Sequence, residues 1–209
     1  ISDKISITPG LSYQYVKFDD TDYRVDDDNT SAGFLNGSPS LNTLAGFIRT
    51  DIDVTEKWRV LAALRADKFS APDETYLAYE LASTYKLNEN NLVRVAVTRS
   101  NSGSFIGYNY LNVIVPTPVP GLNVTQTGNT NLNLFTVNMI EIGYRAQLTK
   151  SLQLDIDVFN QRAENFTEIT AKEFNQMIGV VTAYQFSNLP TTATQNGATI
   201  GLNFVPNDK

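Results

Sequence analysis

Hydrophobic and polar residues alternate along most of the chain, in runs longer than the strands of water-soluble proteins usually reach. From Ile5 to Tyr15 the odd-numbered positions are apolar or aromatic, and the even-numbered positions are serine, threonine, glycine or glutamine. Successive side chains of a strand point to opposite faces. This segment therefore predicts a strand with one apolar face and one polar face.

The same alternation recurs in seven further segments, at residues 44–54, 58–67, 77–87, 93–98, 140–148, 153–158 and 198–204. Within each segment that carries charge, the charged residues share one face; Arg49, Asp51 and Asp53 alternate with Ile48 and Ile52, for example. The pattern predicts about eight strands, mostly near the roughly 9–11 residues that a tilted strand needs to cross a bilayer.

Short and long connections follow one another in order along the chain. Short polar turns are expected at 55–57, 88–91 and 149–151. Longer loops are expected at 19–41, 100–137 and about 171–195, with a brief one at 70–74. Alternate connections of an up-and-down barrel lie on opposite sides of the membrane, so this order predicts an all-β, antiparallel transmembrane barrel wall with its long loops on one side.

A soluble β-sandwich also buries one face of each strand and exposes the other, so it stays open as an alternative. Its strands average five or six residues, and its loops show no such sidedness. Aromatic residues favour the membrane interpretation, because they lie toward strand ends where an interfacial girdle would place them. These residues are Tyr13, Tyr15, Trp58, Tyr85 and Tyr144.

Composition excludes several classes of function. The 209 residues include no cysteine and no histidine, which removes thiolate nucleophiles, disulfides, the usual zinc sites and catalytic pairs of the Ser-His kind. A formal charge of -6 without a cluster of lysine and arginine argues against a nucleic-acid partner. No enzyme activity and no cofactor are expected.

One stretch resembles a known family. Residues 128–135 read Gly-Asn-Thr-Asn-Leu-Asn-Leu-Phe, and after five residues 141–145 read Glu-Ile-Gly-Tyr-Arg. Spacing and residues are similar to a segment of TonB-dependent receptor barrels, Gly-Asn-Pro-x-Leu-x-Pro-Glu followed by Glu-x-Gly-Tyr-Lys/Arg. Thr130, Leu134 and Phe135 depart from it, standing where the family favours proline, proline and glutamate. Residues 95–100 and 148–159 also resemble the family's flanking strands.

The resemblance implies a bacterial outer-membrane receptor that imports a scarce nutrient: an iron chelate, cobalamin or a glycan. Such receptors have a 22-stranded barrel with a plug domain in the lumen. Residues 1–209 would form a partial barrel domain, without the plug and the remaining strands. Implied partners are outer-membrane lipid, the plug, the TonB energising complex acting through the missing N-terminal part, and a small-molecule or glycan ligand. Two alternatives are a small complete eight-stranded barrel with a structural or adhesive role and a soluble carbohydrate-binding β-module.

The loop at 100–137 contains the candidate ligand-binding residues Phe105, Tyr108 and Tyr110. Loops of this length in a compact structure are usually functional or disordered. Exposed aromatic rings there would stack on a sugar or an organic chelate. A purely structural role, in which the rings pack the loop onto its neighbours, is the alternative.

Carboxylates suggest two further sites, each with a simpler explanation. Asp26, Asp27 and Asp28 belong to an acidic loop with Asp19, Asp20 and Asp22 that would attract a hard cation, although it lacks the glycine and terminal glutamate of an EF-hand. A solvated loop of mutually repelling carboxylates is the commoner outcome, so no metal is assigned. The pairs Asp51 with Asp53 and Asp155 with Asp157 resemble catalytic carboxylates in spacing. Lumen-facing charges that pair with arginines on neighbouring strands are the preferred interpretation.

Overall fold

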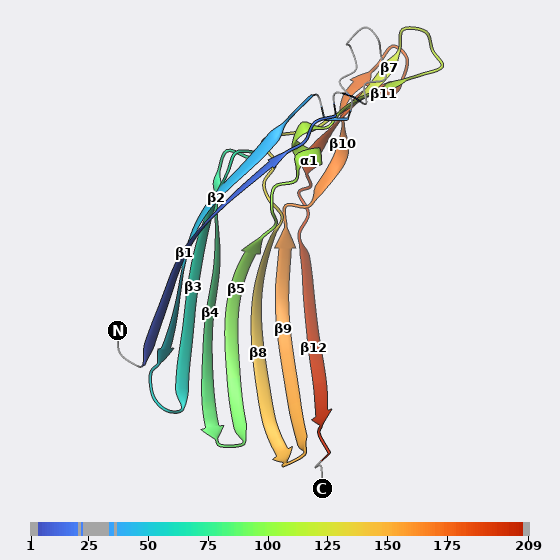
Figure 1. Cartoon of the computed structure of the whole chain (residues 1–209). Helices are drawn as coiled ribbons and strands as arrows, with labels where there is room; N and C mark the ends of the chain where they lie inside the picture. Colours follow the sequence, from blue (N-terminus) through green and yellow to red (C-terminus); the bar gives the residue numbers. More distant parts are fainter. Residues whose placement is uncertain (1–3, 21, 23–33, 36, 207–209) are drawn as a thin grey trace.

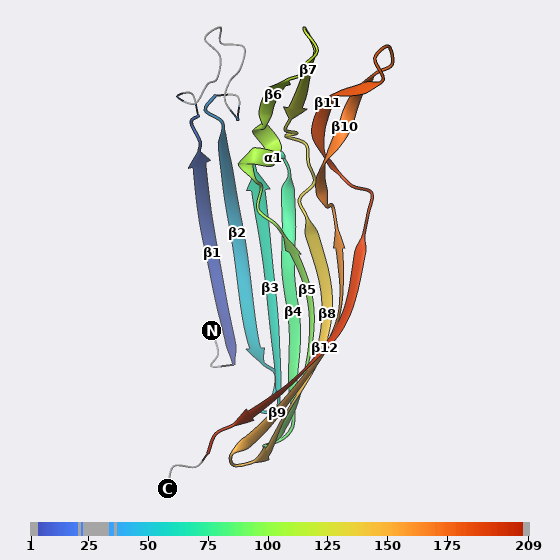
Figure 2. The same cartoon turned by 90° about the vertical axis from the view of Figure 1, so that its right-hand side faces the viewer.

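Eight long strands form one open, curved antiparallel sheet (Figures 1 and 2). The computed structural model describes residues 4–20, 22, 34–35 and 37–206. In spatial order the strands are β1 (Ile5–Lys17), β2 (Ser40–Asp53), β3 (Trp58–Phe69), β4 (Thr75–Asn88), β5 (Asn91–Asn101), β8 (Thr136–Thr149), β9 (Leu152–Glu164) and β12 (Ala193–Phe204). They confirm the predicted wall of about eight strands. Because β1 and β12 do not pair, the sheet is not a closed eight-stranded barrel.

A second, smaller sheet lies at the end of the wall that carries the long connections, at the top of Figure 1. Its order is β10 (Thr167–Asn175), β11 (Val180–Asn188), β7 (Asn123–Thr127) and β6 (Asn112–Pro116), and a short helix, α1 (Ile106–Tyr110), precedes β6. The prediction of loops at 100–137 and 171–195 was wrong in this respect. β6 and β7 show no alternation of apolar and polar positions, and β7 pairs with β11 in parallel across a long sequence separation.

The strand register confirms that the apolar positions of the wall share one face. Ile48 pairs with Leu64, Val95 with Ile142, and Ile52 with Val60. This set, called the apolar face below, consists of Ile48, Ile52, Val60, Leu64, Leu81, Val95, Ile142 and Ile156. Several of its members are about half exposed, as Ile142 is at 53%. Within the described ranges, no helix has the length and hydrophobicity needed to cross a bilayer.

The opposite face, called the charged face, carries ion pairs between arginines and carboxylates. Asp51 accepts from Arg49 at 2.9 Å and from Arg59 on the next strand at 2.7 Å. Arg94 bridges Glu80 and Glu141, which belong to the two strands on either side of it, at 3.3 and 3.2 Å. Two further pairs are Arg65–Asp67 and Arg145–Asp155. One carboxylate of each closely spaced pair, Asp51 and Asp155, is therefore held by arginine, in line with the interpretation preferred from the sequence.

Aromatic residues form a row at the short-turn end of the apolar face. Trp58 pairs with Tyr85 across β3 and β4, and Tyr144 pairs with Val93 across β5 and β8. Two polar tips of this row have local partners: the Trp58 indole donates to Ser83 Oγ at 2.9 Å, and the Tyr144 hydroxyl donates to Asn91 Oδ1 at 2.6 Å. Rings with an apolar body and a bonded polar tip are typical of a membrane interface.

The 209-residue chain is expected to aggregate when it is expressed alone in water. An open sheet leaves the outer edges of β1 and β12 unpaired, and the apolar face adds a broad hydrophobic surface. Size-exclusion chromatography with and without detergent measures this. A monomer without detergent that unfolds in a sharp, reversible thermal transition would contradict the membrane interpretation.

Candidate ligand-binding groove

Two of the three candidate aromatic residues pack together at the start of α1. The rings of Phe105 and Tyr108 meet edge to face with centroids 5.0 Å apart, and Tyr108 also contacts Phe186 of β11 at 4.9 Å. Phe105 is 57% exposed and Tyr108 is 40% exposed. Each ring is thus fixed by a neighbour while much of its surface stays free, which is the state expected of an aromatic ligand contact.

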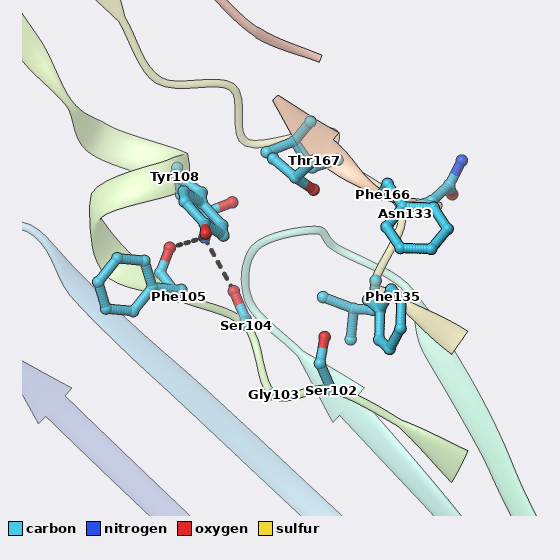
Figure 3. A pocket seen from close by; sticks show the side chains of 12 residues that line it. Ser102, Gly103, Ser104, Phe105, Tyr108, Asn133, Phe135, Phe166 and Thr167 are labelled. Carbon is cyan, nitrogen blue, oxygen red and sulfur yellow. Dashed lines mark hydrogen bonds between the residues drawn. The ribbon is translucent and has the colours of Figure 1, made fainter. Parts of the chain in front are cut away.

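These rings form one side of a cavity of about 420 Å³, called the aromatic groove below (Figure 3). A second ring pair, Phe135 and Phe166 with centroids 5.1 Å apart, forms the opposite side. The remaining lining residues are Ser102, Gly103, Ser104, Asn109, Leu132, Asn133, Leu134 and Thr167. The lining is aromatic and apolar with a few hydroxyl and amide groups, which is the usual composition of a small-molecule site.

A second cavity of about 490 Å³ lies on the charged face of the wall and shares part of this lining. Residues 102–105 line both cavities, and Arg65 and Asp67 contribute to the second one. Because odd-numbered residues of β3 belong to the charged face, this second cavity opens on the side where the ion pairs lie. The segment 102–105 therefore stands between the groove at the long-loop end and the polar side of the wall.

Asn109 holds the first turn of α1 in place, and sequence reasoning missed it. Its Nδ2 donates to Ser104 Oγ at 2.9 Å and to the Phe105 carbonyl at 2.7 Å (dashed lines in Figure 3). Ser104 Oγ in turn donates to the carbonyl of Ala71. The Asn109 side chain is buried, and its Oδ1 has no hydrogen-bond partner among the described residues. A single asparagine in a long loop gives no periodic signal that would have revealed this role.

Residues of the motif at 128–135 contact both α1 and the small sheet. Gly128 packs so closely on α1 that a β-carbon there would lie 2.4 Å from the Asn109 carbonyl carbon. The backbone N–H groups of Gly128 and Asn129 donate to the carbonyls of Leu111 and Tyr108 at 2.6 and 2.8 Å. Asn129 Nδ2 donates to the Phe186 carbonyl at 3.2 Å. The motif thus positions the groove with Gly128 and Asn129, and it lines the groove with Leu132, Asn133, Leu134 and Phe135.

Asparagines stabilise the loop where the resembling family favours proline. The Asn133 N–H donates to Asn188 Oδ1 at 2.7 Å, and Asn188 Nδ2 returns a bond to the Asn133 carbonyl at 2.9 Å. Asn165, in a left-handed conformation with φ of 63°, donates to the Leu134 carbonyl at 3.2 Å. Side-chain bonds to the backbone therefore fix the segment that lacks prolines at 130 and 134.

Replacing Gly128 with valine is expected to detach α1 from the small sheet. The added side chain would meet backbone atoms of Asn109 and Tyr110, which cannot rotate away, and overpacking of this kind costs about 1–3 kcal/mol. Faster limited proteolysis near residues 102–110 in the intact protein is the expected readout. Gly103→Val is the matched control, since a β-carbon at Gly103 has no neighbour within 4 Å. Equal proteolysis of the two variants would refute this role of Gly128.

Of the remaining candidates, Tyr110 lies apart from the aromatic groove. Tyr110, on the same helix, is half-buried and is not among the lining residues. Asp26, Asp27 and Asp28 fall outside the residues that the structure describes. Asp20 is buried and accepts the Leu35 N–H at 2.7 Å, a structural role. In the described part of the chain, no group of three or more acidic residues is arranged to hold a metal ion.

Comparisons with known proteins agree with this architecture. The family model described as TonB dependent receptor-like, beta-barrel, matches residues 1–204. No curated protein sequence matches the chain. Solved structures with a similar fold include the siderophore receptor PirA of Acinetobacter baumannii, with 17% identity and a TM-score of 0.76; the match covers 96% of this chain and 32% of that one.

Two further structures share the fold. A variant of the ferric enterobactin receptor PfeA of Pseudomonas aeruginosa, in complex with enterobactin, has 17% identity and a TM-score of 0.73, with 93% of this chain and 30% of that chain covered. The hemophore receptor HasR of Serratia marcescens, in complex with its hemophore HasA and heme, has 10% identity and a TM-score of 0.66, with 97% and 40% covered. The chain therefore spans about a third of the length of PirA and PfeA.

Proposed function

Because the chain belongs to the TonB-dependent receptor-like β-barrel family, whose members are outer-membrane transporters and not enzymes, we propose that it forms part of the wall and outer binding face of a nutrient importer. In this arrangement the apolar face meets lipid and the charged face lines the lumen. The long-loop end, which carries the aromatic groove, is the side from which ligand arrives.

The observation that carries the proposal is the aromatic groove at that end of the wall. Paired rings on its two sides, with hydroxyl and amide groups between them, suit an organic ligand with flat or ring-shaped parts. Among iron chelates, cobalamin and glycans, we favour an iron chelate. PirA is described as a siderophore receptor, and the matched PfeA variant is in complex with enterobactin.

The proposed partners follow from the two faces of the wall. The charged face, with arginines such as Arg65 and Arg145 in half-exposed ion pairs, would contact a plug domain in the lumen. The TonB complex, which the family implies as a partner, would supply the energy for import. A soluble carbohydrate-binding module is inconsistent with the family to which the chain belongs.

Nutrient uptake by the whole receptor tests this proposal. The receptor is expressed in a bacterial host that lacks its own importers for iron chelates, cobalamin and large glycans, and growth is measured with each nutrient as the limiting supply. Rescue by a ferric chelate, abolished when TonB is absent, is the expected result. Rescue by cobalamin or a glycan alone would overturn the choice of substrate, and rescue without TonB would overturn the proposed mechanism of import.

A further inference from the structure

Two arginines lie on the apolar face, close to its long-loop end. Arg99 of β5 and Arg162 of β9 both pair with Asn138 of β8, so the three residues form one row across three adjacent strands. Residues two apart on a strand share a face, which places Arg99 beside Val97 and Arg162 on the face of Val158. A charge on a lipid-facing surface is costly unless it meets a partner or the interface.

Neither arginine is neutralised within the described part of the chain. Arg99 Nη1 donates to Asn138 Oδ1 at 3.3 Å, and an amide oxygen carries no charge. Arg162 is exposed, and Glu164, the next residue on the same face, forms no ion pair with it. Since neighbouring strands lie about 4.8 Å apart, the two α-carbons are separated by roughly 10 Å, and both long side chains can reach one group between them.

An apolar cavity of about 490 Å³, called the outer groove below, begins next to this row on the same face. Asn160 and Asn196 pair across β9 and β12 one row from the arginines, and they line its near end. Ile140, Ile142 and Val158 line it toward the middle of the sheet, and Phe159 and Gly197 complete the lining. The cavity therefore runs from two cations into the apolar band, along the direction of a lipid acyl chain.

We propose that this row and the outer groove bind one phosphate-bearing lipid of the outer leaflet. Its phosphate would accept hydrogen bonds from Arg99 and Arg162, and one acyl chain would fill the groove. A lone arginine at an interface needs no ligand, because its side chain extends into the headgroups. Here two guanidinium groups without a carboxylate partner in the part of the chain that the structure describes suit the phosphate of an anionic lipid, and the apolar cavity beside them suits its acyl chain. The inference rests on the outer-membrane location and not on the imported nutrient.

Lipid binding to the delipidated, full-length receptor in detergent tests the proposal. Native mass spectrometry counts bound dioleoyl phosphatidic acid, with dioleoyl phosphatidylcholine as the zwitterionic comparison. The wild type should retain one phosphatidic acid in preference to phosphatidylcholine. The Arg99→Gln/Arg162→Gln variant should bind it about tenfold less tightly. The matched control, Lys57→Gln/Lys150→Gln, removes two charges from the short turns at the other end and should bind as wild type.

A second variant tests the cavity while both arginines stay in place. Val158→Trp fills the outer groove and should also weaken binding of phosphatidic acid, so a folding defect of the arginine variant does not leave the question open. Wild-type affinity in either variant would overturn the proposal. Competition by inorganic phosphate at the concentration of the lipid would show that the site takes a free anion instead.

Discussion

Replacing Ile142 with lysine in the intact receptor is expected to lower the free energy of unfolding in lipid by about 2–4 kcal/mol. Ile142 is 53% exposed on the apolar face, and it lies between the interfacial Tyr144 and the polar Asn138 on the same strand. That position is near the middle of the apolar band, where an ammonium group reaches neither headgroup region easily. Equilibrium unfolding in vesicles gives the measurement.

The control places the same lysine on the other face of the wall. Thr199 of β12 pairs with Asp157 on the charged face, so Thr199→Lys puts its ammonium beside a carboxylate. A small change in stability is expected, because charges on a polar luminal face are common. If Ile142→Lys were as stable as wild type, or no less stable than Thr199→Lys, the apolar face would not be the lipid-facing side.

Replacing Phe105 and Tyr108 with alanine is expected to weaken binding of the imported ligand by about 2 kcal/mol or more, roughly thirtyfold. The two rings are held in contact with each other, and Tyr108 also contacts Phe186, so little conformational freedom is lost when a ligand stacks on their free surfaces. The ligand used is the one that the uptake experiment identifies. Its affinity for the whole receptor and the stability of the barrel are measured separately.

Tyr110→Ala provides the comparison for this experiment. Tyr110 belongs to the same helix but does not line the aromatic groove, so its loss should leave affinity nearly unchanged. Unchanged affinity in the Phe105→Ala/Tyr108→Ala variant would rule out the ligand role of these rings. Lower stability together with that unchanged affinity would favour the packing role, in which the rings only hold the loop on its neighbours.

The wall could be predicted from the sequence because each of its strands has two different environments. Sustained alternation, as in residues 5–15 or 140–148, specifies both the strand and its faces. Arg99 is two residues from Val97 and four from Val95, so the sequence alone also places it on their face of the strand. That Arg99 and Arg162 share a row with Asn138 requires the register of three strands, which no single segment encodes.

The aromatic groove was only partly predictable, because long-range contacts create it. Phe105 and Tyr108 were suggested by aromatic residues in a long loop, whereas Phe166 and Phe186 come from a connection about sixty residues further along the chain. The importance of Gly128 was visible only as a family resemblance. Its physical reason, close approach to the backbone of α1, depends on how that helix folds back on the motif.

The parallel pairing of β7 with β11 makes the two long connections, residues 102–135 and 165–192, structurally dependent on each other. Thr125, Thr127 and Asn129 each bond a β11 carbonyl 57 residues later, so every such bond spans both connections. A chimera that exchanges only one connection with a relative would therefore replace one partner of every one of these bonds. Engineering a new specificity onto this wall therefore requires residues 102–135 and 165–192 to be transplanted together, and insertions in one connection should be accompanied by compensating changes in the other.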